Sequence, residues 1–153
     1  MALVRRLFQE NKEPALGGVM REVTIFFSDI EGFTSVSNEK DPAVVVDVLR
    51  DYLSQMTTLV LDRGGHVDKY LGDGLMAFWG APLDDAAHAQ HAVQAALAMQ
   101  AALPALNQEF AARGWPRIRI TIGINTGPMV VGDMGSRHRR AYTVLGDAVN
   151  VAA

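Results

Sequence analysis

The sequence predicts an α+β domain in which two helices alternate with four strands on an antiparallel sheet. Two long segments carry apolar residues at the spacing of an amphipathic helix. Short runs rich in β-branched and aromatic residues lie before, between and after those segments. Two of these runs are separated only by residues 71–74, Leu-Gly-Asp-Gly, which is typical of a hairpin between antiparallel strands.

Composition and turn residues locate the strands. Val23 to Ser28 is the first and reads as a buried strand. His66 to Tyr70 and Leu75 to Trp79 form the hairpin. After the second helix, two runs are expected to pair around the turn Thr126-Gly127-Pro128, and one more short strand follows; these are Ile118 to Asn125, Met129 to Val131 and Ala141 to Leu145.

The first long helix is expected from Asp41, as its cap, to about Asp62, with Pro42 in the first turn and Gly64-Gly65 after its end. Its apolar stripe is predicted to be core, and consists of Val45, Val48, Leu49, Tyr52, Leu53, Met56, Leu59 and Val60.

The second long helix is rich in alanine. Asp84-Asp85 is expected to cap it, and it should reach about Arg113, before Gly114. Pro104 is expected to kink this helix or to begin a second segment. The whole order matches a ferredoxin-like βαββαβ plan with an antiparallel sheet.

The two ends of the chain give less regular signals. Residues 2–13 have the period of an amphipathic helix, which Pro14 stops before the Gly17-Gly18 linker. We therefore expect an N-terminal helix and linker over 1–20 and one domain over 21–153. Gly146 to Ala153 is expected to begin a helix.

Composition excludes several classes of protein. The chain has 153 residues, 49% of them hydrophobic and 20% charged, as in a folded single domain. It contains no cysteine, so disulfides and thiolate metal sites are excluded. A cytoplasmic location is expected, which fits the absence of cysteine. No apolar run approaches the roughly 20 residues of a membrane span, so we expect no membrane segment in this chain. The net charge of −3 gives no basis for binding nucleic acid.

Two acidic segments are the strongest functional signals. Asp29 follows the apolar run that ends at Phe27, and Asp73 lies between two glycines before the apolar residues 75–79. A single aspartate in a turn is most often a cap or turn former. Two that converge at strand ends supply the oxygen ligands that Mg²⁺ or Mn²⁺ prefers. His88 and His91 are three residues apart, but no third ligand is apparent near them.

Four segments resemble the catalytic domain of the class III nucleotidyl cyclases, the adenylyl and guanylyl cyclase family. They are FFSDIEGFT (26–34), KYLGDGLMAFWG (69–80), ITIGINTGPMVVGDMG (120–135) and YTVLGDAVN (142–150), in the order of the family. A lone GDG would be weak evidence, whereas four segments in register are strong. The resemblance, which is to the bacterial type with threonine in its base pocket, runs from about Arg21 to the last residue. It implies the βαββαβ core with additional cyclase-specific elements, of which the C-terminal part is missing.

The resemblance implies an adenylate cyclase, a phosphorus–oxygen lyase that converts ATP to 3′,5′-cyclic AMP and pyrophosphate for signal transduction. Asp29 and Asp73, with the backbone carbonyl of Ile30, match the family's ligands for two Mg²⁺ or Mn²⁺ ions per site. The helix start that follows is expected to present N–H groups to the phosphates from Gly32, Phe33 and Thr34.

Base selection is expected from two residues. Lys69 matches the family's lysine that donates to a ring nitrogen of adenine, and Thr143 falls where many members carry aspartate. A hydroxyl both donates and accepts, so Thr143 suits the amino group of adenine. The alternatives are a surface lysine beside Asp68 and an ordinary strand threonine.

Two further residues are assigned by the same resemblance. Asn150 matches the asparagine that orients the ribose. The phosphate-contacting arginine of some relatives falls at Thr121; Arg119 is two residues earlier on the same strand face, and whether it substitutes is open.

The resemblance implies that each site forms between two domains. Because this chain carries both sets of residues, a head-to-tail homodimer with two sites is expected, together with an upstream regulatory domain in a longer parent protein. The family's transition-state arginine falls four residues after Asn150, beyond Ala153. This chain is therefore expected to be weakly active or inactive, and the alternative function is a catalytically impaired nucleotide-binding or dimerisation module.

Overall fold

The computed structural model describes residues 18–135 and 140–153. The helix expected over 2–13 lies outside the described residues. The elements are β1 (Val19–Ile30), α2 (Phe33–Asn38), α3 (Pro42–Asp62), β2 (His66–Leu71), β3 (Gly74–Trp79), α4 (His88–Ala111), β4 (Ile120–Gly135), β5 (Arg140–Leu145) and α5 (Asp147–Ala152). Strand β1 begins two residues before the expected domain boundary at 21.

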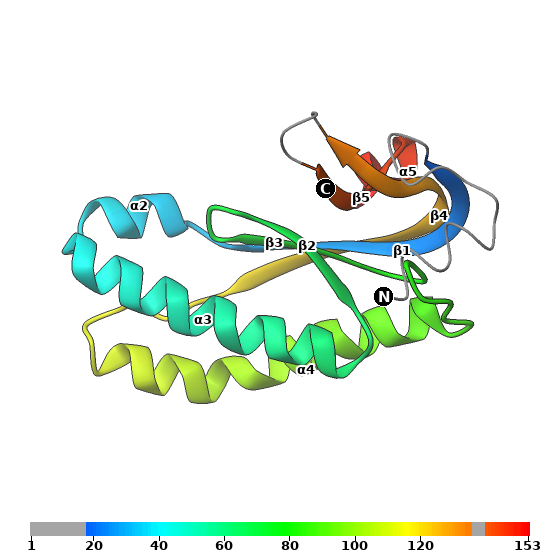
Figure 1. Ribbon diagram of the computed structural model, residues 1–153. Helices are drawn as coiled ribbons and strands as arrows, with labels where there is room; N and C mark the ends of the chain where they lie inside the picture. The colour runs from blue at the N-terminus through cyan, green and yellow to red at the C-terminus, as the bar shows by residue number, and fades with distance from the viewer. Residues whose placement is uncertain (1–17, 136–139) are drawn as a thin grey trace.

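The predicted antiparallel βαββαβ plan is confirmed. The five strands lie in the order β2-β3-β1-β4-β5, and every neighbouring pair is antiparallel. Helices α3 and α4 cover one face of this sheet, while β5 and α5 lie on the other side (Figure 1). Strand β1 is therefore central and covered on both faces, which explains its nearly continuous apolar sequence.

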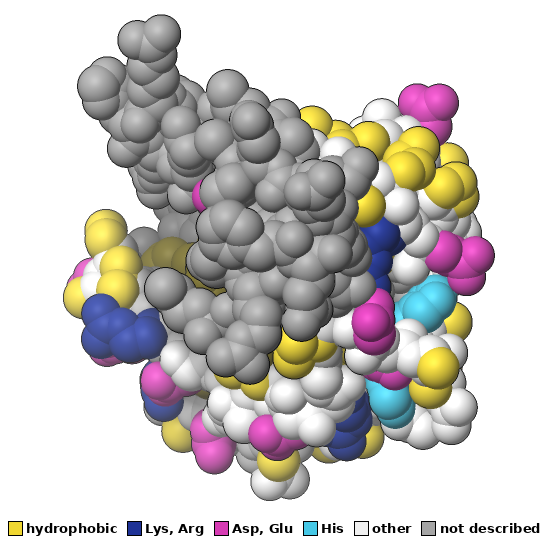
Figure 2. Space-filling model, turned by 45° about the vertical axis from the view of Figure 1, so that its right-hand side comes forward, with side chains coloured by type: hydrophobic (Ala, Val, Ile, Leu, Met, Phe, Trp, Pro, Cys, Tyr) yellow, Lys and Arg dark blue, Asp and Glu magenta, His cyan; other side chains and the backbone are white. Residues whose placement is uncertain are grey.

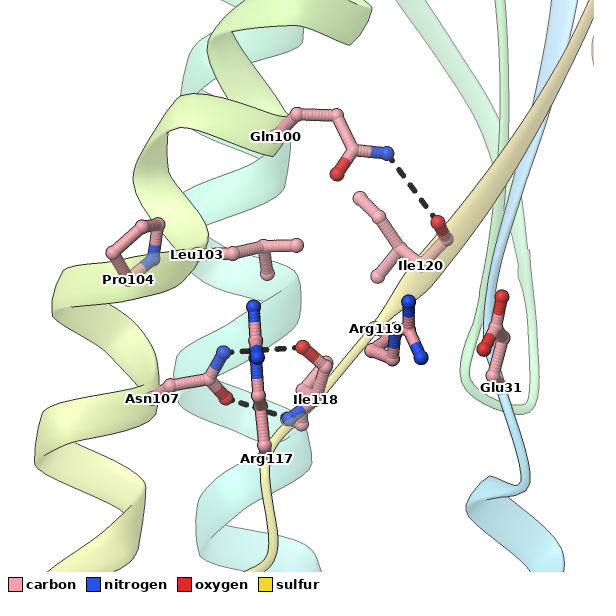
Figure 3. A pocket seen from close by; sticks show the side chains of 9 residues that line it. All are labelled: Glu31, Gln100, Leu103, Pro104, Asn107, Arg117, Ile118, Arg119 and Ile120. Atoms are coloured by element: carbon pink, nitrogen blue, oxygen red, sulfur yellow. Dashed lines mark hydrogen bonds between the residues drawn. The ribbon is translucent and has the colours of Figure 1, made fainter.

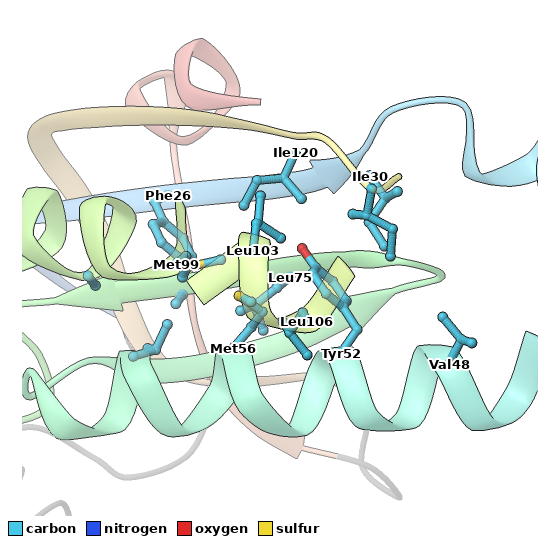
Figure 4. Packing of buried hydrophobic residues seen from close by; sticks show 14 of the residues in the cluster. Phe26, Ile30, Val48, Tyr52, Met56, Leu75, Met99, Leu103, Leu106 and Ile120 are labelled. Atoms are coloured by element: carbon cyan, nitrogen blue, oxygen red, sulfur yellow. The ribbon is translucent and has the colours of Figure 1, made fainter. Parts of the chain in front are cut away.

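Side chains of β1 alternate between two hydrophobic clusters. Phe26 and Ile30 pack with the stripe of α3 and with α4, where Tyr52, Met56 and Leu103 are buried (Figure 4). Val23, Ile25 and Phe27 face the opposite side and pack with β5 and α5. This alternation puts the side chain of Asp29 on the face away from the two long helices.

Helix α3 follows its prediction. Asp41 is the N-cap, and its Oδ1 accepts a hydrogen bond of 2.9 Å from the backbone N–H of Ala43. Gly64, at a φ of 79°, follows the helix where a left-handed residue is needed. Every residue of the predicted stripe is buried or partly buried against the first cluster.

The predicted start of α4 is wrong. The helix begins at His88, and its N-cap, Ala87, makes no side-chain cap. Asp85 instead accepts from the N–H of Ala87 at 2.9 Å, in a turn that precedes the helix. Pro104 lies inside α4 and does not begin a second segment, although it cannot donate to the Gln100 carbonyl.

The expected turn at Thr126-Gly127-Pro128 does not form. These residues lie within one strand, β4, and pair with β1, Pro128 opposite Glu22. Strand β5 pairs with β4 only from Val130 onward, so at Pro128 no described strand pairs with the other edge of β4. A proline is tolerated at such an edge because no neighbouring strand needs its N–H.

Candidate active site

The two predicted metal aspartates meet. Asp29 lies one residue before the end of β1, and Asp73 lies in the turn between β2 and β3, which the pairing of Ser28 with Leu75 brings to the same place. The backbone N–H of Ile30 donates to Asp73 Oδ2 at 2.9 Å. A hydrogen bond to the Asp73 side chain, followed by burial and the Asp73 charge, raises the pKa of Asp29 to about 6. Two carboxyl groups this close favour a shared proton or a cation between them.

A buried polar pair that the sequence did not indicate lies next to these aspartates. Ser28 Oγ and the hydroxyl of Tyr52 are buried and have no hydrogen-bond partner among the described residues. Burial raises the pKa of Tyr52, an effect that the neighbouring Ser28 side chain partly offsets and that the charges of Asp73 and Asp29 reinforce. The sequence indicated Tyr52 only as a core position of α3. Its polar end in fact lies within electrostatic reach of both carboxylates.

The expected phosphate cradle follows β1 directly. Gly32, at a φ of 64°, is the N-cap of α2, and Phe33 and Thr34 are the first two residues of that helix. The first N–H groups of a helix have no partner within it, so they are available to an anion. The ring of Phe33 packs against Trp115 with centroids 5.7 Å apart, which anchors the short helix.

Arg119 lies beside this cradle. The backbone N–H of Glu31 donates to the Arg119 carbonyl at 2.8 Å, one step beyond the pairing of Ile30 with Ile120. Since Asp29 pairs with Thr121, Arg119 lies on the same face of the sheet as Asp29. Within the described residues Arg119 has no ion-pair partner.

A pocket of about 520 Å³ opens between Glu31, α4 and the start of β4 (Figure 3). The side chains of Arg117 and Arg119 line it. The side-chain amide of Asn107 donates to the Ile118 carbonyl and accepts from the Ile118 N–H. The side chain of Gln100 donates to the Ile120 carbonyl at 3.3 Å. These amide contacts hold the start of β4, and with it Arg119, against α4.

Thr143 contacts Asp68, a residue to which the sequence analysis assigned no role. The Thr143 hydroxyl donates to Asp68 Oδ2 at 2.5 Å, although β5 and β2 are at opposite ends of the strand order. The β4–β5 hairpin folds across the sheet, so that the ring of Tyr142 lies 5.8 Å from that of His66. Asp68 immediately precedes Lys69, which is exposed. The sequence feature that could have indicated a role for Asp68 is its position next to Lys69.

The packing of α5 against β4 determines the position of Asn150. The side chain of Asn125 donates to the Ala148 carbonyl at 2.8 Å. Gly123 lies so close to α5 that a Cβ there would be 2.1 Å from the Ala152 carbonyl oxygen. Asn150 itself is exposed on α5, on the same side of the sheet as Thr143.

The two histidines of α4 have separate partners. His88 Nδ1 lies 2.6 Å from Thr24 Oγ1, and its Nε2 lies 3.5 Å from Glu22. His91 Nδ1 lies 2.6 Å from Asp85 Oδ2. In the part of the chain that the structure describes, no three metal-ligating side chains gather. Histidine side chains lie beside acidic ones on the face in Figure 2, where charges of both signs are mixed.

None of the described helices is both long enough and apolar enough to cross a membrane.

Comparison with known proteins agrees with this geometry. The family model described as "Adenylate and Guanylate cyclase catalytic domain" matches residues 18–153. The chain is 38% identical over 151 residues to adenylate cyclase 1 of Rhizobium meliloti, covering 99% of this chain and 23% of that protein. It is 41% identical over 137 residues to an adenylate cyclase of Anabaena cylindrica, covering 87% and 26%. The chain thus spans about a quarter of the length of these relatives.

Two solved structures have the same fold. The crystal structure of an adenylyl cyclase from P. aeruginosa has a TM-score of 0.86 and 38% identity, covering 90% of this chain and 71% of that one. A guanylyl cyclase has a TM-score of 0.86 and 40% identity, covering 90% and 70%. Similarity alone therefore does not choose between adenine and guanine. With the converging aspartates and the family model in agreement, the chain belongs to the family of adenylate and guanylate cyclase catalytic domains.

Proposed function

We propose that this domain is an adenylyl cyclase, which closes ATP to 3′,5′-cyclic AMP and releases pyrophosphate with the help of two divalent cations. The observation that carries the proposal is the meeting of Asp29 with Asp73 at the end of β1, beside the start of α2. That arrangement suits a metal–triphosphate complex. Both curated relatives named above are adenylate cyclases.

The residues present fit a pair of Mg²⁺ or Mn²⁺ ions. Asp29 and Asp73 would hold them, with the Ile30 carbonyl as a third oxygen, and substrate phosphates complete such sites in proteins. Bound cations would supply acidification of the ribose 3′-hydroxyl and neutralisation of phosphate charge. The raised pKa of Asp29 supports this assignment. It reflects a hydrogen bond to Asp73, burial and the Asp73 charge, and a cation would take the place of the shared proton and offset that charge.

The phosphates would lie along the start of α2. The N–H groups of Gly32, Phe33 and Thr34 would donate to them. Arg119 would add a guanidinium, since it lies on the face of Asp29 and has no carboxylate partner among the described residues. Arg119 would orient the triphosphate so that the attacked phosphorus and the leaving oxygen stay aligned.

Adenine would be read by Lys69 and Thr143, and the ribose by Asn150. Lys69 donates only, which suits a ring nitrogen of adenine. Thr143 belongs to β5 and Asn150 to α5, and these two elements lie on the same side of the sheet (Figure 1).

Two copies of the chain would form the complete sites. Leu71 of the β2–β3 hairpin and Leu145 and Val151 near β5 and α5 are large apolar residues that are 53%, 55% and 73% exposed. These are close in sequence to the proposed metal and base residues, which supports an interface there. A head-to-tail dimer would pair the metal half of one copy with the base half of its partner. The greater length of the matched relatives supports a regulatory region elsewhere in the parent protein.

The test is an assay, with ATP and Mn²⁺, of the purified chain and of a longer form extended past Ala153. Cyclic AMP and pyrophosphate should appear in equal amounts, at a much lower rate in the shorter protein. Asp29→Asn and Asp73→Asn should each lower this activity by about a hundredfold or more, because one charged ligand is lost. They should also abolish the rise in melting temperature that Mn²⁺ gives the unaltered chain. Asp47→Asn, on the exposed side of α3, is the matched control and should change neither quantity.

Two results would contradict the proposal. Mn²⁺-dependent stabilisation that survives in both variants would remove the metal assignment. Binding of ATP with Mn²⁺ without formation of cyclic AMP, in the longer form as well as in this chain, would instead favour the alternative function, a nucleotide-binding or dimerisation module.

A further inference from the structure

We infer that Asp68 is a positioning residue that makes the Thr143 hydroxyl a hydrogen-bond acceptor, and that this contact selects adenine over guanine. The inference rests on the proposed function, in which Lys69 and Thr143 face the base. It addresses a question that overall similarity leaves open, because the chain is about equally similar to an adenylyl and a guanylyl cyclase structure.

A β-bulge in β2 brings Asp68 to this position. His66 pairs with Phe78 and Val67 with Ala77, but the next paired residue is Lys69, opposite Met76. Asp68 is therefore the extra residue. Phe78 and Met76 belong to the cluster on the β5 side of the sheet, so Lys69 faces that side as well. In a regular strand Asp68 and Lys69 would point to opposite faces, whereas here both serve the same face.

The contact fixes the direction of one hydrogen atom. Thr143 Oγ1 lies 2.5 Å from Asp68 Oδ2 and donates to it. An ionised carboxylate only accepts hydrogen bonds, and a hydroxyl has a single hydrogen to give. Thr143 therefore turns its lone pairs, and no hydrogen, toward any other partner. Without Asp68 the same hydroxyl would be free to donate or to accept.

The resulting pair of groups is complementary to adenine. Adenine presents an amino group, which donates, beside a ring nitrogen that accepts; guanine presents a carbonyl oxygen beside a ring N–H. Lys69 as a donor and Thr143 as an acceptor match the first pattern at both points and the second at neither. A buried polar group left without its partner is what discriminates most strongly between such ligands.

Neighbouring aromatic rings hold the two strands in place for this contact. His66 stacks on Phe78 with centroids 4.8 Å apart, and Tyr142, next to Thr143, lies 6.0 Å from Phe78. Asp68 and Thr143 are each partly buried, so the hydrogen bond is shielded from competing water.

The experiment compares the preference for ATP over GTP, by binding affinity with Mn²⁺ and by kcat/KM, in the unaltered chain and in Asp68→Asn. An amide can donate to Thr143 Oγ1 and so release its hydrogen toward guanine. We expect the preference for ATP to fall about tenfold, which is the usual effect of one hydrogen bond. Asp68→Ser is a second variant expected to act in the same direction, and Asp68→Glu, which retains the carboxylate, should keep most of the preference. Asp47→Asn is again the control.

A double-mutant cycle distinguishes an effect of Asp68 that acts through the Thr143 hydroxyl from a general structural effect of changing Asp68. In a Thr143→Val background, where no hydroxyl remains, Asp68→Asn should change the preference no further. An unchanged preference in Asp68→Asn and Asp68→Ser, or an equal shift with and without the Thr143 hydroxyl, would overturn the inference. A shifted binding preference without cyclic AMP formation would support the inference and contradict the proposed function. Binding of neither nucleotide by the unaltered chain would overturn both.

Discussion

Asp29 shares a hydrogen bond with Asp73, and its pKa is raised to about 6 as a result. Thr143 has its hydroxyl hydrogen directed to Asp68. In both cases the chemistry of the side chain depends on one neighbour from the β2–β3 hairpin, Asp73 in its turn or Asp68 in β2. Residue-scale predictions for this site therefore concern pairs of residues.

Lys69→Glu should lower kcat/KM for ATP more than that for GTP. The change replaces a donor with an acceptor that would face the ring nitrogen of adenine, and a mismatched hydrogen bond in a partly closed site costs about 1–3 kcal/mol, or roughly ten- to a hundredfold. Competition between ATP and GTP in one reaction measures the ratio directly. Lys40→Glu, a lysine outside the site whose ammonium donates to the Gly114 carbonyl, is the control. An ATP to GTP ratio that does not move would show that Lys69 is an ordinary surface residue.

His66 should make the fold sensitive to mild acid. Burial lowers the pKa of His66 below 6.5, an effect that the charge of Asp68 only partly offsets. The unfolded chain therefore binds a proton more readily than the folded one, and the stability due to neutral His66 is lost as the pH falls through and below 6.5. His66→Phe keeps an aromatic ring against Phe78 and should reduce the fall in melting temperature between pH 7.5 and 5.5.

The measurement is the difference in melting temperature between His66→Phe and the unaltered chain at each pH. Asp29, whose pKa is raised, contributes stability of the opposite sign, since that stability is lost as the pH rises through about 6. Because Asp29 is present in both proteins, its contribution cancels. Equal pH dependence in His66→Phe and in the unaltered chain would exclude His66 as the cause.

At the scale of elements, the site depends on how closely α5 approaches β4. Strand β4 pairs with β1 along most of its length and with β5 near its end, so it connects the strand that carries Asp29 to the strand that carries Thr143. Helix α5 lies on β4 where Gly123 has no side chain, and the bond from Asn125 to the Ala148 carbonyl holds it there. This packing sets the position of Asn150.

Gly123→Ala should displace α5. Its Cβ would lie 2.1 Å from the Ala152 carbonyl oxygen, which is backbone and cannot rotate away. We expect a loss of about 1–3 kcal/mol of unfolding free energy, as for other overpacked sites, and weaker nucleotide binding. Gly127→Ala on the same strand is the matched control, because its Cβ would meet only the Ala148 Cβ, at 3.2 Å, and should cost less. Denaturant unfolding of both variants provides the comparison; equal losses would contradict this account of α5.

For the whole molecule, the central question is whether the metal and base residues of one copy serve the same site. The proposed head-to-tail dimer assigns Asp29 and Asp73 to one site and Lys69, Thr143 and Asn150 to the other. The exposed Leu71, Leu145 and Val151 give each copy apolar surface for such an association.

Mixing two inactive variants tests this arrangement. Asp29→Asn lacks a metal ligand and Asn150→Ala lacks the ribose contact, so each alone should be nearly inactive. When equal amounts exchange subunits, half of the dimers are mixed and each has one intact site of two, which should restore about a quarter of the activity of the unaltered chain. The control is Asp29→Asn mixed with Asp73→Asn, where both changes fall in the same half and no activity should return. Recovery in the control, or none in the test mixture, would contradict the shared sites.

The sequence by itself determined the βαββαβ plan and the positions of Asp29 and Asp73, the proposed metal ligands, in the chain. Helix α3 follows from the cap at Asp41, the apolar stripe and the glycines after its end, all of which act within a few residues. Local signals also place Asp29 near the end of a buried strand and Asp73 in a hairpin turn. These features could be predicted because local interactions specify them, whereas it is the pairing of β1 with β3 that brings the two aspartates together.

Only the tertiary structure decided the rest. Thr126, Gly127 and Pro128 carry turn signals, yet they continue β4 because β1 pairs with them and no described strand pairs with the opposite edge at Pro128. Asp68 contacts Thr143 across 75 residues, through a bulge and a folded hairpin that no local pattern reveals. The physical reason is that pairing between distant strands overrides local turn preference, and it also determines which polar side chains become partners.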